Sequence, residues 1–116
     1  MNIKTLEISQ TRFGSACVLA LVGRIDSSNA EQFSTHVNQL FQAGEKDVVV
    51  DFKEVLYLTS AAFRVLLVAT DEAERNAARF VLCGLVGQVR ELFEMGGLLD
   101  AFAVHASRED ALAQPG

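Results

Sequence analysis

The sequence predicts an α/β fold, in which short buried strands alternate with amphipathic helices. Two observations carry this prediction. Short apolar runs bounded by glycine or acidic residues are typical of strands covered on both faces, and apolar residues recur at helical spacing between them. Because half of the 116 residues are apolar, the chain can bury one hydrophobic core. We therefore expect residues 1–116 to form a single domain.

The first two predicted strands form a hairpin. Residues 3–9 alternate weakly, whereas residues 15–22 form a richer apolar run that Gly14 opens and Gly23 closes. If residues 22–25 make a separate short strand, the element order is β-β-β-α-β-α-β-α-β-α. If they do not, the chain has one strand fewer.

A first helix is predicted to follow and to end at Gly44. Glu31 lies three residues after Ser28, which is the spacing of a capping box. The candidate N-caps are Asp26, Ser27 and Ser28. The apolar stripe of this helix consists of Ala30, Phe33, Val37, Leu40 and Phe41.

The rest of the chain repeats the strand–helix alternation. Strands are predicted at residues 47–52, 79–83 and 101–106. Helices are predicted at residues 60–76, 87–95 and 107–114, the last one capped by Ser107. The stripe of the second helix consists of Ala62, Val65, Leu66, Ala69, Ala73 and Ala77, and that of the third contains Val89, Leu92 and Phe93.

The charge pattern and the chain start limit the partners and the compartment. The net charge is −5 and no basic patch is visible, which argues against nucleic acid and anionic membrane surfaces as partners. No apolar run reaches about 18 residues, so no segment is expected to enter a membrane. The start MNIKTLEISQ does not resemble a signal peptide. We therefore expect a cytoplasmic protein.

Catalytic and metal sites are poorly supported, and no cofactor is expected. His36 and His105 lie in different elements and lack ligand spacing with the cysteines. Cys17 and Cys83 lie in apolar strands and are expected to be buried and reduced. No nucleophile–base pair, acid–base pair or glycine-rich phosphate loop is visible. The sequence does not favour an enzyme.

The most informative pattern is the segment in which a strand, a short loop and a helix start bring two hydroxyls, on Thr59 and Ser60, to a helix N-terminus. One explanation is structural, because either hydroxyl can cap the helix. The other is phosphorylation, since helix amides and the helix dipole favour an anion there. Arg64, one turn later, is either a partner for that phosphate or a solvated surface residue.

At these residues the chain resembles the STAS domain family of anti-sigma factor antagonists. LVGRID resembles the family's G-E-L-D turn, and VVVDFKEVLYLTSAAFRVLL resembles its V-V-L-D-L-S…Y-I-S-S-A-G-L-R-V-L-L segment. The segment from RFVLC to DALA is similar to the second half of the family, with Gly97 and Leu98 in its A-G-L turn. The resemblance implies a STAS-like sandwich, with a mixed sheet of about four to six strands and about four helices packed largely on one face.

The resemblance also implies a partner-switching role. The unphosphorylated domain would bind an anti-sigma factor, usually a serine kinase of the GHKL type. That kinase would phosphorylate a serine at the helix N-terminus, and a PP2C-type phosphatase would remove the phosphate and restore binding. By position, Ser60 is the expected phospho-acceptor and Thr59 the second choice. The expected partner-binding residues are Asp26, Thr59, Ser60, Ala61, Ala62, Phe63 and Arg64.

Three acidic or small residues refine this expectation. Ala62 replaces the family's usual glycine, which costs stability only if the backbone there has positive φ. Its methyl group is also expected beside Ser60, where it would stiffen the loop or abolish the switch. Asp26 is expected to face the acceptor site, and Asp51 to help terminate its strand.

One alternative function belongs to a different class. Some single-domain STAS proteins resemble subunits of lipid-transporting ABC complexes. In that case the helix would dock on an ATPase subunit without phosphorylation. The genes next to this one would distinguish the two possibilities.

Overall fold

The computed structural model describes residues 5–113 as one five-stranded sheet with four α-helices, in agreement with the predicted fold class. The strands are β1 (Leu6–Phe13), β2 (Ala16–Ile25), β3 (Asp47–Leu58), β4 (Arg79–Cys83) and β5 (Ala103–His105). The helices are α1 (Ala30–Gln42), α2 (Ser60–Arg75), α3 (Gly87–Met95) and α4 (Arg108–Leu112), with a short 3₁₀ helix at Leu99–Ala101. The start of the first predicted strand, at residues 3 and 4, and the predicted end of the last helix, at residue 114, lie outside the described residues.

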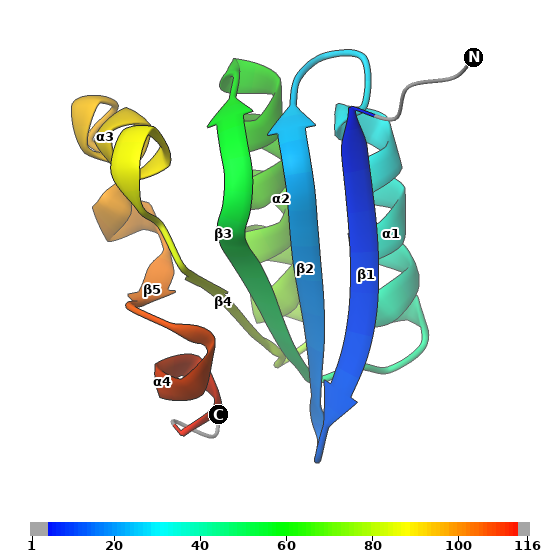
Figure 1. Cartoon of the computed structure of the whole chain (residues 1–116). Coiled ribbons are helices and arrows are strands. Elements are labelled where there is room, and N and C mark those ends of the chain that lie inside the picture. Colours follow the sequence, from blue (N-terminus) through cyan, green and yellow to red (C-terminus); the bar gives the residue numbers. More distant parts are fainter. Residues whose placement is uncertain (1–4, 114–116) are drawn as a thin grey trace.

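The strands follow one another across the sheet in chain order, from β1 to β5 (Figure 1). β1 and β2 form the predicted antiparallel hairpin, and the remaining neighbours are parallel. Residues 22–25 belong to β2, so the expectation with one strand fewer is confirmed. Gly23 does not close the strand. It lies inside β2 with φ +113°, and a Cβ there would stand 2.2 Å from the carbonyl oxygen of Thr5.

The main core lies between the sheet and the first three helices. The predicted stripe of α1 is wholly buried, and Ala62, Leu66, Ala69 and Ala73 are the buried residues of α2. Val65 is half-buried, while Ala77 lies beyond the end of α2 with φ +52°. α3 joins this core through Phe93, whose ring packs edge-on against Phe52, Phe63 and Phe102.

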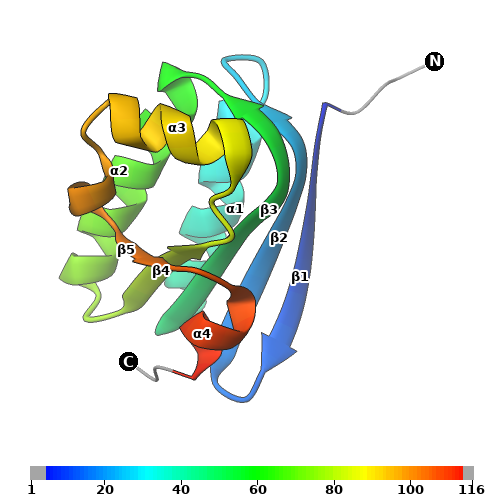
Figure 2. The same cartoon turned by 60° about the vertical axis from the view of Figure 1, so that its left-hand side comes forward.

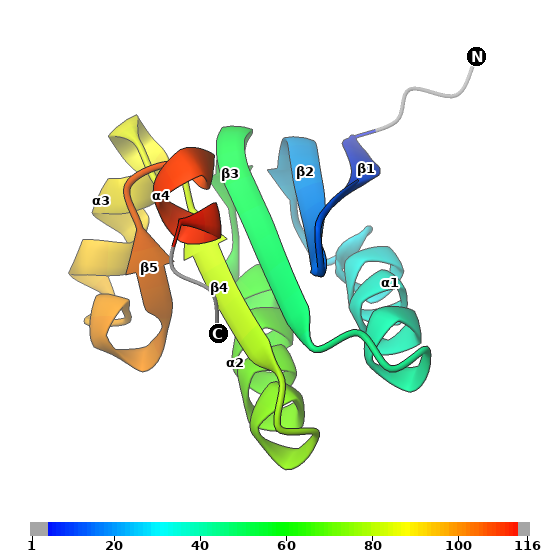
Figure 3. The same cartoon turned by 90° about the horizontal axis from the view of Figure 1, so that it is seen from below.

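The last helix lies on the opposite face of the sheet. Figure 3 shows α1 and α2 on one side of the strands and α4 on the other, and Figure 2 shows the same separation from the side. There α4 buries Ala111 against a second cluster, which consists of Val18, Val49, Val81 and Cys83. Ser107 caps α4 as predicted, because its hydroxyl accepts a hydrogen bond from the Asp110 amide at 3.1 Å.

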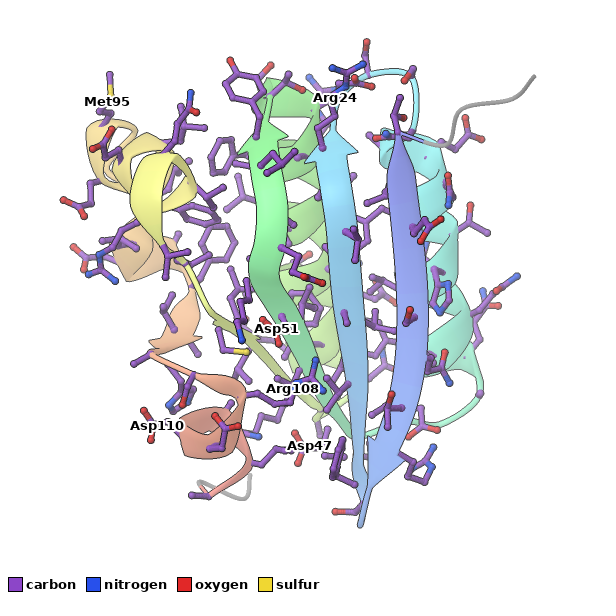
Figure 4. All side chains as sticks on the ribbon, in the orientation of Figure 1. Arg24, Asp47, Asp51, Met95, Arg108 and Asp110 are labelled. Carbon is purple, nitrogen blue, oxygen red and sulfur yellow. The ribbon has the colours of Figure 1, made fainter. Side chains whose placement is uncertain are left out.

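The loop predicted after residue 52 is wrong, because β3 continues to Leu58. The extension pairs with β2 through two register shifts and buries Val55 and Leu58 on the helical side of the sheet. The prediction that Asp51 ends its strand is wrong for the same reason. Asp51 lies in the middle of β3, and its carboxylate faces Arg108 of α4 (Figure 4).

Candidate functional site

Thr59 is the only residue between β3 and α2, so the sheet leads directly into the helix. Its amide donates a hydrogen bond to the Ile25 carbonyl at 3.0 Å, and its own carbonyl accepts one from the Ala62 amide at 3.0 Å. The first bond ties the start of α2 to the end of β2, and the second begins the helix. Ser60 is the first helical residue, and its backbone is therefore fixed from both sides.

The two candidate hydroxyls have different surroundings. The Thr59 Oγ1 atom is buried without a hydrogen-bond partner, and it does not cap α2. Ser60 is exposed at the start of the helix. The capping explanation is thus not realised by Thr59, and the hydroxyl that another protein can reach is that of Ser60.

The substitution at Ala62 carries no backbone cost. Among the described residues, the non-glycine residue with positive φ is Ala77, so Ala62 has ordinary helical geometry. The side chain of Ala62 is fully buried in the main core. The expectation that its methyl group stands beside Ser60 in the path of a kinase is therefore wrong, because the group points into the protein.

The turn that precedes α1 lies beside this site, since Ile25 is the partner of Thr59. The Asp26 carboxylate accepts hydrogen bonds from the Ser28 amide at 2.9 Å and the Ser28 hydroxyl at 2.5 Å. These bonds, with a smaller contribution from Arg24, lower the pKa of Asp26. Asp26 thus follows the residue that bonds to Thr59, but it does not line the groove beside Ser60, and its carboxylate is engaged by its own turn.

Asn29 holds this turn in place and is the N-cap residue of α1, so the predicted capping box of Ser28 and Glu31 is wrong. It is buried, its Oδ1 accepts from the Asp26 amide at 2.9 Å, and its Nδ2 donates to the Arg24 carbonyl at 3.0 Å and the Thr5 hydroxyl at 2.7 Å. Sequence reasoning missed this residue. The signal was the D-S-S-N run, in which aspartate and asparagine both bond to nearby backbone.

A shallow groove of about 390 Å³ runs between α1 and α2 beside Ser60. It is lined by Ala30, Glu31, Ser34, Ser60, Ala61, Arg64 and Val65. Three of the predicted partner-binding residues, Ser60, Ala61 and Arg64, thus meet on one surface. Phe63 does not line this groove. Its ring is half-buried, and the ring centroid lies 4.9 Å from that of Phe93.

A second, larger pocket of about 590 Å³ lies on the other face of the sheet, beside α4. Asp51 and Arg108 contribute to its wall, and the two side chains form an ion pair at 3.0 Å. Asp51 therefore belongs to the anchoring of α4 and lies apart from the Ser60 groove.

The candidate metal ligands of the described residues are dispersed. Within residues 5–113, no three His, Cys, Asp or Glu side chains are grouped to hold a metal ion. Cys17 and Cys83 are buried free thiols, as predicted. Burial raises the pKa of both thiols, that of Cys83 to about 12. None of the helices between residues 5 and 113 has the length and apolar character that crossing a bilayer requires.

Comparisons with known proteins agree with the fold and identify the family. The BtrV protein of Bordetella bronchiseptica, provisionally named an anti-sigma factor antagonist, is 33% identical over 108 residues, or 93% of each chain. An anti-sigma factor antagonist from Mycobacterium paratuberculosis has the same fold, with a TM-score of 0.84 at 18% identity over 93% of this chain and 92% of that one. So does phosphorylated SpoIIAA from Bacillus, with a TM-score of 0.69 at 21% identity over 93% and 96%. The STAS domain family matches residues 7–111, and this chain therefore belongs to the STAS domain family.

Proposed function

We propose that this protein is an anti-sigma factor antagonist that works by partner switching. In the unphosphorylated state it binds an anti-sigma factor, which is a serine kinase of the GHKL type. The kinase transfers the γ-phosphoryl group of ATP to the Ser60 hydroxyl and releases ADP and a proton, and the complex separates. A PP2C-type phosphatase hydrolyses the phosphate and resets the switch.

The observation that carries this proposal is the exposed hydroxyl of Ser60 at the first residue of α2. A phosphoserine there adds about −1.5 to −2 charges beside helix amides that favour an anion, so the fold tolerates it. A partner that packs against the α1–α2 groove meets that new charge directly. Phosphorylation thus disrupts binding without unfolding the protein.

Three further parts of the proposal follow from it. The protein acts by binding in the cytoplasm and has no catalytic activity of its own. Ser60 is the acceptor, and Thr59 is disfavoured because its hydroxyl is buried. Asp26, Ala61 and Arg64 contact the partner, while Ala62 and Phe63 support the surface from inside.

The direct test is a pull-down with wild type, Ser60→Ala and Ser60→Asp, paired with kinase treatment and mass spectrometry. Phosphate is expected on Ser60, the alanine variant is expected to keep its partner, and the aspartate variant to lose it. Ser9→Asp is the matched control, because it adds the same charge at an exposed serine on β1. It should bind like wild type.

Two results would contradict the proposal. One is equal binding by Ser60→Asp and Ser60→Ala. The other is a partner that proves to be the ATPase subunit of a transporter and binds without any modification of Ser60. The second result would favour the transporter function instead.

A further inference from the structure

The free cation of the α1–α2 groove is Arg64. The other arginines of the described chain form ion pairs with carboxylates, namely Arg12, Arg24, Arg75, Arg79, Arg90 and Arg108. Arg64 forms none with any residue between 5 and 113, and it is exposed. An exposed guanidinium without a carboxylate, on the wall of a groove, is available for another anion.

Ser60 and Arg64 lie four residues apart on α2 and line the same groove. Helical residues at this spacing face the same side, with Cβ atoms about 5–6 Å apart. A phosphate on Ser60 and the flexible arginine side chain are therefore within reach of each other. Arginine also matches phosphate geometry well, because it donates two parallel hydrogen bonds.

The acids near the groove do not compete strongly for Arg64. Glu31 of α1 lines the groove but does not pair with Arg64, and the Asp26 carboxylate is bound by Ser28. Both acids would repel a phosphate on Ser60. Arg64 is thus the cation placed to offset that repulsion.

We propose that Arg64 is the counter-ion of the phosphate on Ser60 and pairs with it along one turn of α2. This role rests on the proposed function, since it assumes Ser60 as the acceptor. Phosphorylation then has two effects on the groove. It adds negative charge at Ser60, and it withdraws the guanidinium that the unmodified protein presents to its partner.

The test measures the phosphate directly and needs no kinase. Phosphoserine is inserted at position 60 during translation in wild type, Arg64→Lys and Arg64→Gln, and the second pKa of the phosphate is measured by ³¹P NMR. Because a cation favours the dianion, the pKa is expected to be about 0.3 pH units lower in wild type than in Arg64→Gln. Arg64→Lys should lie nearer to wild type, and the difference should shrink in about 1 M salt.

Two arginines serve as controls. Arg75 lies at the far end of α2, and Arg24 lies at the end of β2 near the site (Figure 4). Arg75→Gln should leave the phosphate pKa at the wild-type value, and Arg24→Gln, which acts only through Asp26, should shift it by less than Arg64→Gln does. Equal pKa values in wild type and Arg64→Gln, or an equal shift in either control, would overturn the proposal. The proposed function fails separately, if no kinase modifies Ser60 or the Ser60 variants bind alike.

Discussion

At the scale of single residues, Thr59 and Ser60 divide two roles between adjacent hydroxyls. The Thr59 methyl and hydroxyl groups lie where β3 meets α2, and the hydroxyl is buried without a partner. Ser60 offers its hydroxyl to solvent. The sequence placed the pair at a helix N-terminus. Spacing alone does not reveal which side chain turns inward, because that depends on how α2 packs on the sheet.

The buried hydroxyl makes a testable prediction about stability. Valine has nearly the shape of threonine and carries no polar atom that must leave water. Thr59→Val is therefore expected to leave the free energy of unfolding unchanged or to raise it by up to about 1 kcal/mol. Urea unfolding measures this difference, with Ser60→Ala as the control at an exposed position. A loss of more than about 1 kcal/mol in Thr59→Val would show that the hydroxyl is satisfied in solution.

At the scale of elements, the helices were easier to predict than the strands. The stripe of α1 repeats at 3.6 residues and depends on its own sequence, so all five predicted residues are buried. The second half of β3 mixes Lys53 and Glu54 with exposed Leu56 and Tyr57. Its strand conformation depends on pairing with β2 across two register shifts, which no local pattern records.

α3 is held to the rest of the protein by Phe93, and this leads to a prediction. Phe93 is fully buried, and its ring contacts aromatic rings from β3, α2 and the end of the 3₁₀ helix. Phe93→Ala is expected to lower the free energy of unfolding by about 3–5 kcal/mol, because the cavity lies among three fixed rings. Met95, two residues later, is 84% exposed, and Met95→Ala should change stability by less than about 0.5 kcal/mol.

Chemical denaturation of the two variants compares a buried and an exposed residue on one short helix. If Phe93→Ala lost no more stability than Met95→Ala, the aromatic cluster would not anchor α3. The position of Met95 at the outer end of α3 is visible in Figure 4.

At the scale of the whole molecule, one ion pair and one hydrogen bond fasten α4 to the sheet face that the other helices leave open. The Oδ2 atom of Asp51, in β3, lies 3.1 Å from Nε and 3.0 Å from Nη2 of Arg108. Arg79 of β4 bonds to Asp47 at 2.8 Å and to the Ala111 carbonyl at 2.6 Å. Arg108 lies far along the chain from Asp51, so the sequence could not show that the aspartate serves a helix added at the end.

This attachment predicts a large difference between two aspartates. Asp51 also accepts a hydrogen bond from the Lys53 amide, and it is nearly buried. Asp51→Ala leaves the Lys53 amide and the Arg108 guanidinium without this acceptor. The substitution is expected to lower the free energy of unfolding by about 1–3 kcal/mol. Asp71→Ala breaks an exposed pair with Arg75 on α2 and should cost less than about 1 kcal/mol.

Thermal and urea unfolding of both variants, with proteolysis near the C-terminus as a second measurement, tests the attachment. Faster cleavage within α4 is expected in Asp51→Ala alone. Equal stability and equal cleavage in the two variants would mean that the apolar contacts of Ala111 hold α4 without help from the Asp51–Arg108 ion pair.

The single-residue junction between β3 and α2 allows Ser60, the proposed acceptor, little backbone movement. A flexible loop can fold a new phosphate away or swing it toward a distant pocket, but Thr59 is tied to β2 by its amide and to α2 by its carbonyl. Under the proposed function, the phosphorylated and unphosphorylated proteins are therefore expected to share nearly the same backbone. A partner would then distinguish the two forms by the charge at residue 60, because their shapes are the same.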